Sequence, residues 1–185
     1  MEEKPEKREL NFVAIFTALL LAGAAIGAMV WESIDSSPDY IVTKKKISSA
    51  ELVDFRKNIE QMVLSHTVRH EGEMPIVHPP AGSDIFLLAR HHDWGKYILE
   101  LEQGKPYRLR LTSLDVRHSL LVHELNLMNR IVFGELITVE FAPAKAGRFK
   151  IKCGDYCGPQ HHNMIGTIIV NPSHASVLDK PGPSQ

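Results

Sequence analysis

The sequence predicts a mainly β fold, a β-sandwich preceded by one N-terminal transmembrane helix, and two observations carry this prediction. Residues 10–31 contain no charged side chain, and about 20 such residues can cross a bilayer as one helix. From residue 84 onward, short apolar runs alternate with Gly, Pro and charged turns, a pattern typical of a β-sandwich. The net charge of −1 argues against a nucleic acid as partner.

The apolar stretch at 10–31 is interpreted as a retained membrane anchor. Lys4, Lys7 and Arg8 precede it, and three lysines at 44–46 follow it, so the charges alone do not fix its orientation. A cleaved secretory signal peptide is the alternative, because small residues within the stretch resemble a cleavage site. Gly23 and Gly27 form a GxxxG face, which another helix could approach closely.

Residues 32–83 are predicted to connect the anchor to the β domain. An amphipathic helix is expected within them at 49–66, because Ser48 or Ser49 can cap its first turn and apolar residues recur at helical spacing. These apolar residues are Leu52, Phe55, Ile59, Met62 and Val63. The histidines and glutamates between 66 and 78 could form a second metal site, but spacing alone is weak support. We interpret them as a solvated or interface cluster.

Residues 84–171 are predicted to be the β domain, with short strands separated by turns. The expected strands begin at Ile85, Tyr97, Tyr107, Ile137, Phe149 and Thr167. Gly and Pro residues near 104 and 143–147 supply the turn chemistry between them. The last two strands therefore flank residues 153–164, and the tail at 172–185 is expected to be extended.

Both cysteines of the chain lie in one run, Cys153-Gly-Asp-Tyr-Cys157-Gly-Pro-Gln-His161-His-Asn-Met164. Two thiolates, an imidazole and a thioether are soft ligands, which suit copper better than magnesium or calcium. A blue-copper site uses one thiolate, whereas two thiolates can bridge two metal ions. His118 follows an apolar-alternating run and is the chosen second histidine. A disulfide or a structural zinc site is the alternative, but neither explains Met164.

These residues give the chain a resemblance to subunit II of cytochrome c oxidases and related haem-copper oxidases. The resemblance covers about residues 94–170, through Asp-Val-x-His-Ser at 115–119, Val-His-Glu-Leu at 122–125 and Cys-x-x-x-Cys-Gly-x-x-His-x-x-Met-x-Gly-Thr at 153–167. It implies a cupredoxin-like Greek-key β-sandwich with a dinuclear copper centre, two copper ions in all. The implied ligands are bridging Cys153 and Cys157, one histidine for each copper (His118 and His161), and weakly bound Met164 and the backbone carbonyl of Asp155.

The resemblance also implies a function. The subunit would accept electrons from a cytochrome c or a small copper protein and pass them to haem in the catalytic subunit I of a terminal oxidase. The copper domain would then lie on the outer, periplasmic side of the inner (plasma) membrane, with residues 1–9 in the cytoplasm. Trp94 is the candidate at which electrons enter, because the family carries surface aromatics in the matching stretch. The alternative for Trp94 is an aromatic that packs the edge of the sandwich.

Two other functions stay open. The same copper subunit could serve a haem-copper nitric oxide reductase, whose copper ligands could be identical. The chain could also be a membrane-tethered copper carrier or a structural subunit. The run around Cys157 is not Cys-x-x-Cys-His, so the chain offers no site for covalently bound haem.

Overall fold

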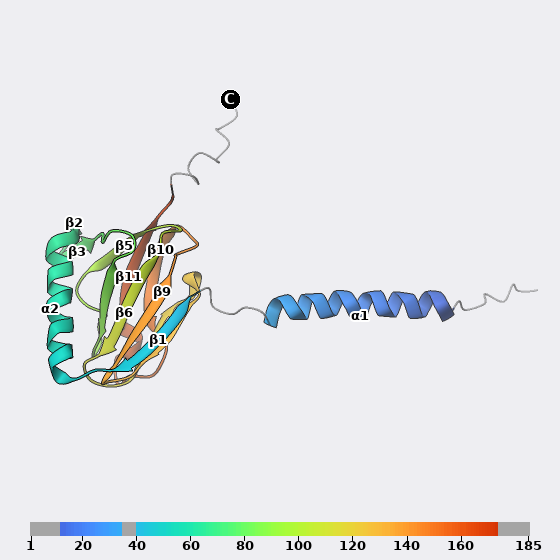
Figure 1. The fold of residues 1–185 in the computed structure, drawn as a ribbon, viewed down its shortest axis with the longest axis horizontal. Helices are drawn as coiled ribbons and strands as arrows, with labels where there is room; N and C mark the ends of the chain where they lie inside the picture. The colour runs from blue at the N-terminus through green and yellow to red at the C-terminus, as the bar shows by residue number, and fades with distance from the viewer. Residues whose placement is uncertain (1–11, 35–39, 174–185) are drawn as a thin grey trace, which may run out of the picture. The chain divides into compact units, whose positions relative to one another are not determined.

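A computed structural model describes residues 12–34 and 40–173 of the chain (Figure 1). The chain divides into two compact units, Met1–Ser37 and Pro38–Gln185. Residues 1–11 and 174–185 lie outside the described residues, and with them the predicted cytoplasmic N-terminus and most of the predicted tail.

The described part of the first unit is the helix α1, Phe12–Ile34. Its described side chains are exposed, and its apolar part, Phe12–Val30, is long and apolar enough to cross a membrane. At 1.5 Å per residue the 23 residues span about 34 Å, close to the thickness of a bilayer's hydrocarbon core. The apolar helix predicted near the N-terminus is therefore present.

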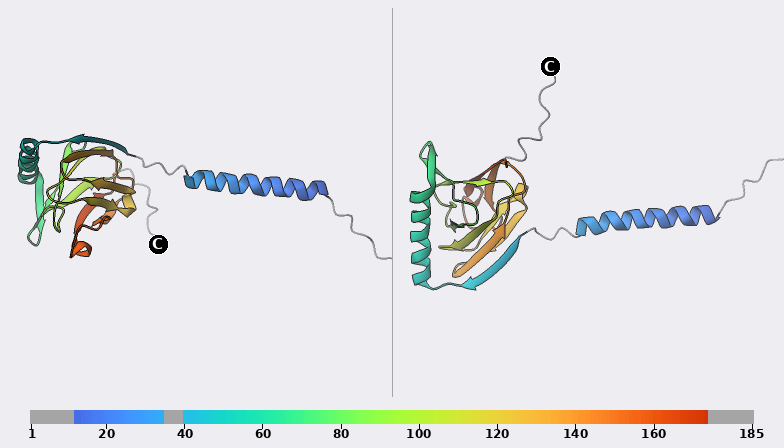
Figure 2. Two further views of the ribbon diagram at one scale, coloured as in Figure 1. Left: turned by 90° about the horizontal axis from the view of Figure 1, so that it is seen from below. Right: turned by 45° about the horizontal axis from the view of Figure 1, so that its top comes forward.

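The second unit is a sandwich of two β-sheets, so the predicted mainly β sandwich fold is confirmed (Figures 1 and 2). One sheet has the order β1-β9-β6-β4. Its strands are β1 (Ile41–Lys46), β9 (Glu135–Phe141), β6 (Tyr107–Ser113) and β4 (Asp84–Ala89). The other sheet has the order β2-β3-β5-β11-β10-β7-β8. Its strands are β2 (Thr67–Glu71), β3 (Met74–Val77), β5 (Ile98–Glu102), β11 (Ile165–Asn171), β10 (Gly147–Cys153), β7 (His118–Val122) and β8 (Leu127–Ile131).

The core lies between the two sheets and follows from the alternation of side chains along each strand. In β8, for example, Leu127 and Ile131 are buried while Met128 and Arg130 are exposed, because successive side chains point to opposite faces. Leu111 of the first sheet and Leu120 of the second are completely buried in one continuous cluster. This packed interior holds the strands rigidly, and the strand ends carry the site described below.

The helix α2 occupies the predicted range, Ser49–His66. A capping box begins it: Ser48 Oγ accepts from the Glu51 backbone N–H, and the Glu51 carboxylate accepts from the Ser48 backbone N–H. Its buried face includes Phe55 and Met62. The Phe55 ring packs edge-on against the ring of Phe86 in β4, with 5.3 Å between the two ring centroids. Figure 2 shows α2 lying along one side of the sandwich.

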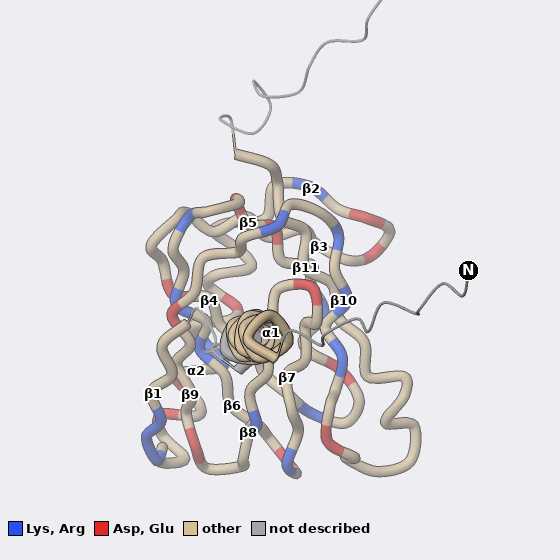
Figure 3. The backbone as a smooth tube through the Cα atoms, turned by 90° about the vertical axis from the view of Figure 1, so that its right-hand side faces the viewer, with Lys and Arg blue, Asp and Glu red and all other residues tan. Residues whose placement is uncertain are grey.

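Three strands come from the segment predicted only to connect the anchor to the β domain. β1 pairs with β9, β3 pairs with β5, and β2 forms a hairpin with β3, so the sandwich begins well before residue 84. β1 is an edge strand whose six residues, Lys44, Lys45 and Lys46 among them, are all exposed, and Figure 3 shows blue, the colour of Lys and Arg, near the label β1. Such a strand lacks the apolar alternation by which strands are recognised in a sequence.

Candidate metal centre

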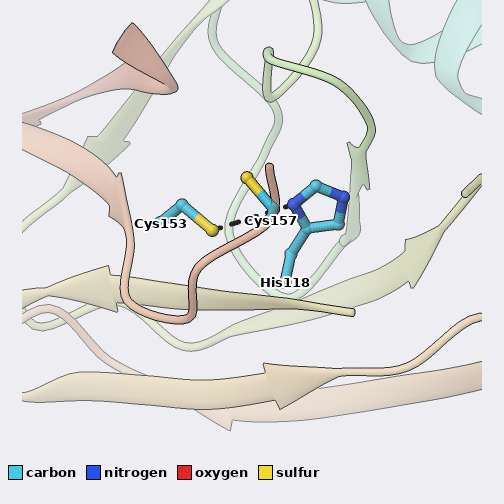
Figure 4. A group of neighbouring side chains, drawn as sticks. All are labelled: His118, Cys153 and Cys157. Carbon is cyan, nitrogen blue, oxygen red and sulfur yellow. Dashed lines mark hydrogen bonds between the residues drawn. The ribbon is translucent and has the colours of Figure 1, made fainter. Parts of the chain in front are cut away.

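The candidate centre lies at the end of the seven-stranded sheet where β7 begins and β10 ends. β10 pairs with β7, with Cys153 opposite Leu120, and this register brings the end of β10 beside His118, the first residue of β7. The Gly154 N–H donates to the Ser119 carbonyl at 2.8 Å and holds the start of the following loop to β7. Figure 4 shows His118, Cys153 and Cys157 pointing toward one another.

The ligand atoms of these three residues all lie within 4.8 Å of one another. His118 Nδ1 is 3.7 Å from Cys153 Sγ, and His161 Nδ1 is 3.4 Å from Cys157 Sγ. Each thiol therefore has one histidine nitrogen beside it. His118 is completely buried, both cysteines are buried, and His161, in the 3-10 turn η2 (His161–Asn163), is partly exposed.

The two predicted weak ligands also face the thiols. Cys153 Sγ lies 3.1 Å from the Asp155 carbonyl oxygen, and Cys157 Sγ lies 3.9 Å from Met164 Sδ. The Asp155 carboxylate accepts from Arg117 Nε at 3.3 Å and from Arg130 Nε at 3.2 Å. These ion pairs fix the turn that presents the Asp155 carbonyl inward.

The structure thus gathers all six residues that the sequence predicts as ligands, although ligation itself stays a prediction. Both cysteines are free thiols rather than a disulfide. Among the described residues, His118, Cys153 and Cys157 are the one group of three or more such side chains close enough to hold a metal ion. Two sulfurs, two imidazole nitrogens and a thioether are a soft donor set, and this set fits copper.

Burial and the neighbouring Cys153 raise the pKa of the Cys157 thiol to about 11. The thiol is therefore protonated at neutral pH in the metal-free protein, and a bound metal ion must displace its proton because the thiolate is the ligand.

Asp115 was not among the predicted site residues, although it belongs to the Asp-Val-x-His-Ser motif. Its Oδ1 lies 2.7 Å from His118 Nε2, so the other ring nitrogen, Nδ1, is left facing Cys153. A carboxylate behind a ligating histidine commonly fixes the orientation and tautomer of that histidine. Burial raises the pKa of the Asp115 carboxyl, but hydrogen bonds from His118 and from the His91 and Val116 backbones outweigh burial and hold it below its ordinary value.

His91 is a second residue that the sequence did not single out. Its Nε2 donates to the Cys157 carbonyl oxygen at 2.6 Å, its Nδ1 lies 2.9 Å from Asp115 Oδ2, and its backbone N–H donates to the same Oδ2 at 2.7 Å. His91 therefore connects Asp115 to the loop that carries Cys157. No spacing signal could have found it, because 66 residues separate His91 from Cys157.

Trp94 is buried rather than exposed at the surface, in keeping with the alternative of an aromatic that packs the sandwich, and a role of Trp94 in electron entry stays a prediction. Its side chain is only 2% exposed, and its Nε1 donates to the Met164 carbonyl oxygen at 3.3 Å. Gly166 makes room for it, because a Cβ at this position would lie 3.2 Å from Trp94 Cβ. Trp94 thus packs inside the sandwich behind the predicted ligand Met164.

The comparisons with known proteins identify relatives of the chain. No family model matches the chain. A cytochrome c oxidase subunit 2 of Thermus thermophilus is 32% identical over 110 residues, which are 56% of this chain and 82% of that protein. A second cytochrome c oxidase subunit 2 from the same species shows the same identity over 66% of its length.

Among solved structures, the cryo-EM structure of a heme-copper terminal oxidase dimer contains a chain that is similar over 86% of this chain and 98% of its own. The TM-score is 0.47 and the sequence identity is 20%. The similarity to the first Thermus protein covers most of that protein's length at more than 30% identity. The chain therefore belongs to the cytochrome c oxidase subunit 2 family, whose members are subunits of an oxidoreductase complex.

Proposed function

We propose that this chain is the subunit through which electrons enter a haem-copper terminal oxidase, and that it holds a dinuclear copper centre. The observation that carries the proposal is the pairing within the site. Two buried thiols each face one histidine Nδ1, at 3.7 and 3.4 Å, and each also faces one weaker donor. Two bridging thiolates with one histidine at each end form a ligand set for two metal ions, whereas a blue-copper ion uses one thiolate.

In this proposal Cys153 and Cys157 bridge two copper ions, His118 and His161 bind one each, and Met164 and the Asp155 carbonyl are weak ligands. Two copper ions held there would take up and release one electron at a time. The protein's part is to keep the ligand positions constant during this change. His118 is fixed by Asp115, and Cys153 is fixed by the pairing of β10 with β7, so little rearrangement accompanies electron transfer.

Burial supports electron transfer over the copper-carrier alternative. Cys153 is 8% exposed, Cys157 5%, Met164 1% and His118 0%. A carrier must hand its copper to another protein, which requires ligands that an acceptor can reach. Four of the five side-chain ligands are thus covered and His161 is partly exposed, an arrangement that suits a resident ion better than one handed to another protein.

We further propose that α1 crosses the inner membrane once, with the copper domain on the periplasmic side. α1 has the length and composition of such a span. A haem-bearing catalytic subunit in the membrane would receive the electrons, and a soluble electron-transfer protein outside would supply them. In this arrangement the copper domain has an electron donor outside the membrane and an electron acceptor in the catalytic subunit.

Copper content and electron-spin resonance of the purified full-length chain test the proposal. We expect two copper ions per chain and a hyperfine pattern from two equivalent nuclei. Cys153→Ser should remove this pattern while the melting temperature stays close to that of wild type, because serine is nearly isosteric. Met74→Leu, in β3 of the same sheet, is the control and should keep the pattern. One copper ion per wild-type chain, zinc in the site, or the two-nuclei pattern in Cys153→Ser would contradict the proposal.

A further inference from the structure

Two arginines converge on one carboxylate at the outer side of the candidate centre. Arg117 Nε lies 3.3 Å from Asp155 Oδ2, and Arg130 Nε lies 3.2 Å from the same oxygen. We call Arg117, Arg130 and Asp155 the arginine cluster. Its two cations and one anion leave one positive charge uncompensated.

Each member of the arginine cluster is a neighbour of the centre. Arg117 directly precedes His118, and Asp155 lies between the two cysteines. Arg130 of β8 is paired with Ser119 of β7, the residue that follows His118. His118 is buried whereas both arginines are exposed, so the cluster lies on the solvent side of these strand ends.

The second arginine adds little to folding. The side chains of Arg117 and Arg130 are 61% and 63% exposed, and ion pairs this exposed contribute little to stability. One arginine alone would already neutralise Asp155. The Asp155 carboxylate is partly buried, and the backbone carbonyl oxygen of the same residue lies 3.1 Å from Cys153 Sγ. Asp155 thus holds two cations next to a thiol that is proposed to bind copper.

A cation beside a copper centre changes the midpoint potential of that centre in one direction. The oxidised centre carries one more positive charge than the reduced centre, so a neighbouring cation destabilises the oxidised form more. Reduction then becomes easier, and the midpoint potential rises. The Asp155 carboxylate alone would lower the potential, and the two arginines together reverse this effect.

We propose that Arg117 and Arg130 raise the midpoint potential of the copper centre, and that Asp155 holds both guanidinium groups beside it. The proposal rests on the proposed function and adds the residues that set the driving force for reduction of the centre. The centre gains one electron from its donor, and neither arginine is oxidised, reduced or bonded to copper. Arg117 and Arg130 are therefore positioning residues, which act through Asp155 and through their charge.

Redox titration of the purified full-length chain with copper bound tests the proposal, with electron-spin resonance as the readout of the oxidised centre. The variants change the charge of the arginine cluster in single steps. Two arginines minus one aspartate give +1 in wild type. Arg117→Gln and Arg130→Gln each give 0, the double variant gives −1, and Asp155→Asn gives +2. Arg117→Lys and Arg130→Lys keep the charge of wild type.

We expect the midpoint potential to follow this charge. Asp155→Asn should have the highest potential, followed by wild type, the two single Gln variants and the double variant. Each step should change the ratio of reduced to oxidised centre, at a fixed ambient potential, by about three- to tenfold, which is about 30–60 mV for one electron. The two Lys variants should match wild type.

The opposite shifts of Asp155→Asn and the Gln variants decide between charge and geometry. If the cluster only held the turn, loss of either partner would break the same ion pairs and shift the potential in the same direction. Shifts in the same direction, Lys variants that behave like the Gln variants, or potentials that ignore the charge would overturn the proposal. If one Gln variant loses its two-copper signal, the other arginine and Asp155→Asn decide.

Arg148→Gln is the matched control. Arg148 is an exposed arginine paired with Glu71, and it lies in β10 five residues before Cys153, or about 17 Å along the strand. This separation exceeds the Debye length of about 8 Å at 0.15 M salt, so the potential should equal that of wild type. An equal drop in Arg148→Gln would overturn the assignment to the cluster. A missing two-copper signal in wild type would instead contradict the proposed function.

Discussion

Asp115→Asn is predicted to weaken copper binding while the sandwich stays folded. The two carboxylate oxygens of Asp115 serve different partners. Oδ1 faces His118 Nε2 and the Val116 backbone N–H, both at 2.7 Å, and Oδ2 accepts from His91. Asparagine has only one oxygen, and its NH2 group is a donor. In either orientation, one histidine therefore meets a donor in place of an acceptor.

The size of the effect follows from the bond that is lost. A hydrogen bond to a charged group contributes about 1.5–3 kcal/mol, and each 1.4 kcal/mol is about tenfold in affinity. Copper affinity should therefore fall by about 10- to 100-fold, the range found when the partner of a ligating histidine is removed. Where the new NH2 group faces His118 Nε2, His118 Nδ1 is no longer held toward the site. Where it faces His91, the His91 N–H loses its acceptor and the loop that carries Cys157 is held less firmly.

Competition with a chromophoric copper(I) chelator, applied to the full-length chain, measures this affinity. Asp84→Asn is the matched control, because Asp84 pairs with Arg108 and Arg110 in the four-stranded sheet and contacts none of the site residues. It should bind copper as wild type does. Copper affinity in Asp115→Asn equal to that of the control would refute the role assigned to Asp115.

Three further predictions concern the weak ligand, the helix and one buried carboxylate. Met164→Leu should keep both coppers and raise the midpoint potential, because a lost electron donor destabilises the oxidised state; an unchanged potential in redox titration would remove Met164 from the ligand set. Ser48→Ala removes the cap of α2 and should cost about 1 kcal/mol in urea unfolding, and no loss would show that packing alone holds the helix. Hydrogen bonds from Arg69 lower the pKa of Glu100 below its ordinary 4.5. Ionised Glu100 therefore stabilises the fold above pH 4.5, and this stability is lost as the pH falls through the lowered pKa. The difference in melting temperature between wild type and Glu100→Gln should shrink over the same range of pH, and a constant difference would contradict this prediction.

The strands that the sequence predicted bury alternate positions or are almost all apolar, but β7 and β8, which have the same kind of burial pattern, were not predicted. β6 has the sequence Tyr107-Arg-Leu-Arg-Leu-Thr-Ser113. Its apolar positions are buried and Arg108 is exposed, and such alternation of apolar and polar residues predicts a strand. β1 was missed because its residues are exposed at a sheet edge. The hairpin of β2 and β3 was missed because it is short, charged on one strand and interrupted by Pro75. β1 is stabilised by pairing rather than by burial of its own side chains, whereas β3 buries Ile76 and Val77 but has only four residues.

Five of the six predicted ligands lie within the twelve residues 153–164. Four of them would bind through their side chains, and Asp155 would bind through its backbone carbonyl. Ligand spacing on a single loop is constrained by the geometry of the site, so it survives in the sequence as a motif. Only His118 comes from another strand, and its place beside Cys153 depends on the register of β7 with β10. The structure supplies this register, which the sequence alone did not determine.

The sequence does not predict which of the two aromatic side chains, Trp94 or His91, is exposed. Both lie in the same short loop and both are aromatic, so the sequence offers no reason to prefer the histidine. Their roles differ because the backbone turns the Trp94 ring inward, against Gly166 and the Met164 carbonyl, and leaves His91 at the surface. His91 is 39% exposed, and its hydrogen bond reaches across 66 residues of sequence to the Cys157 carbonyl oxygen, a contact that no spacing in the sequence predicts.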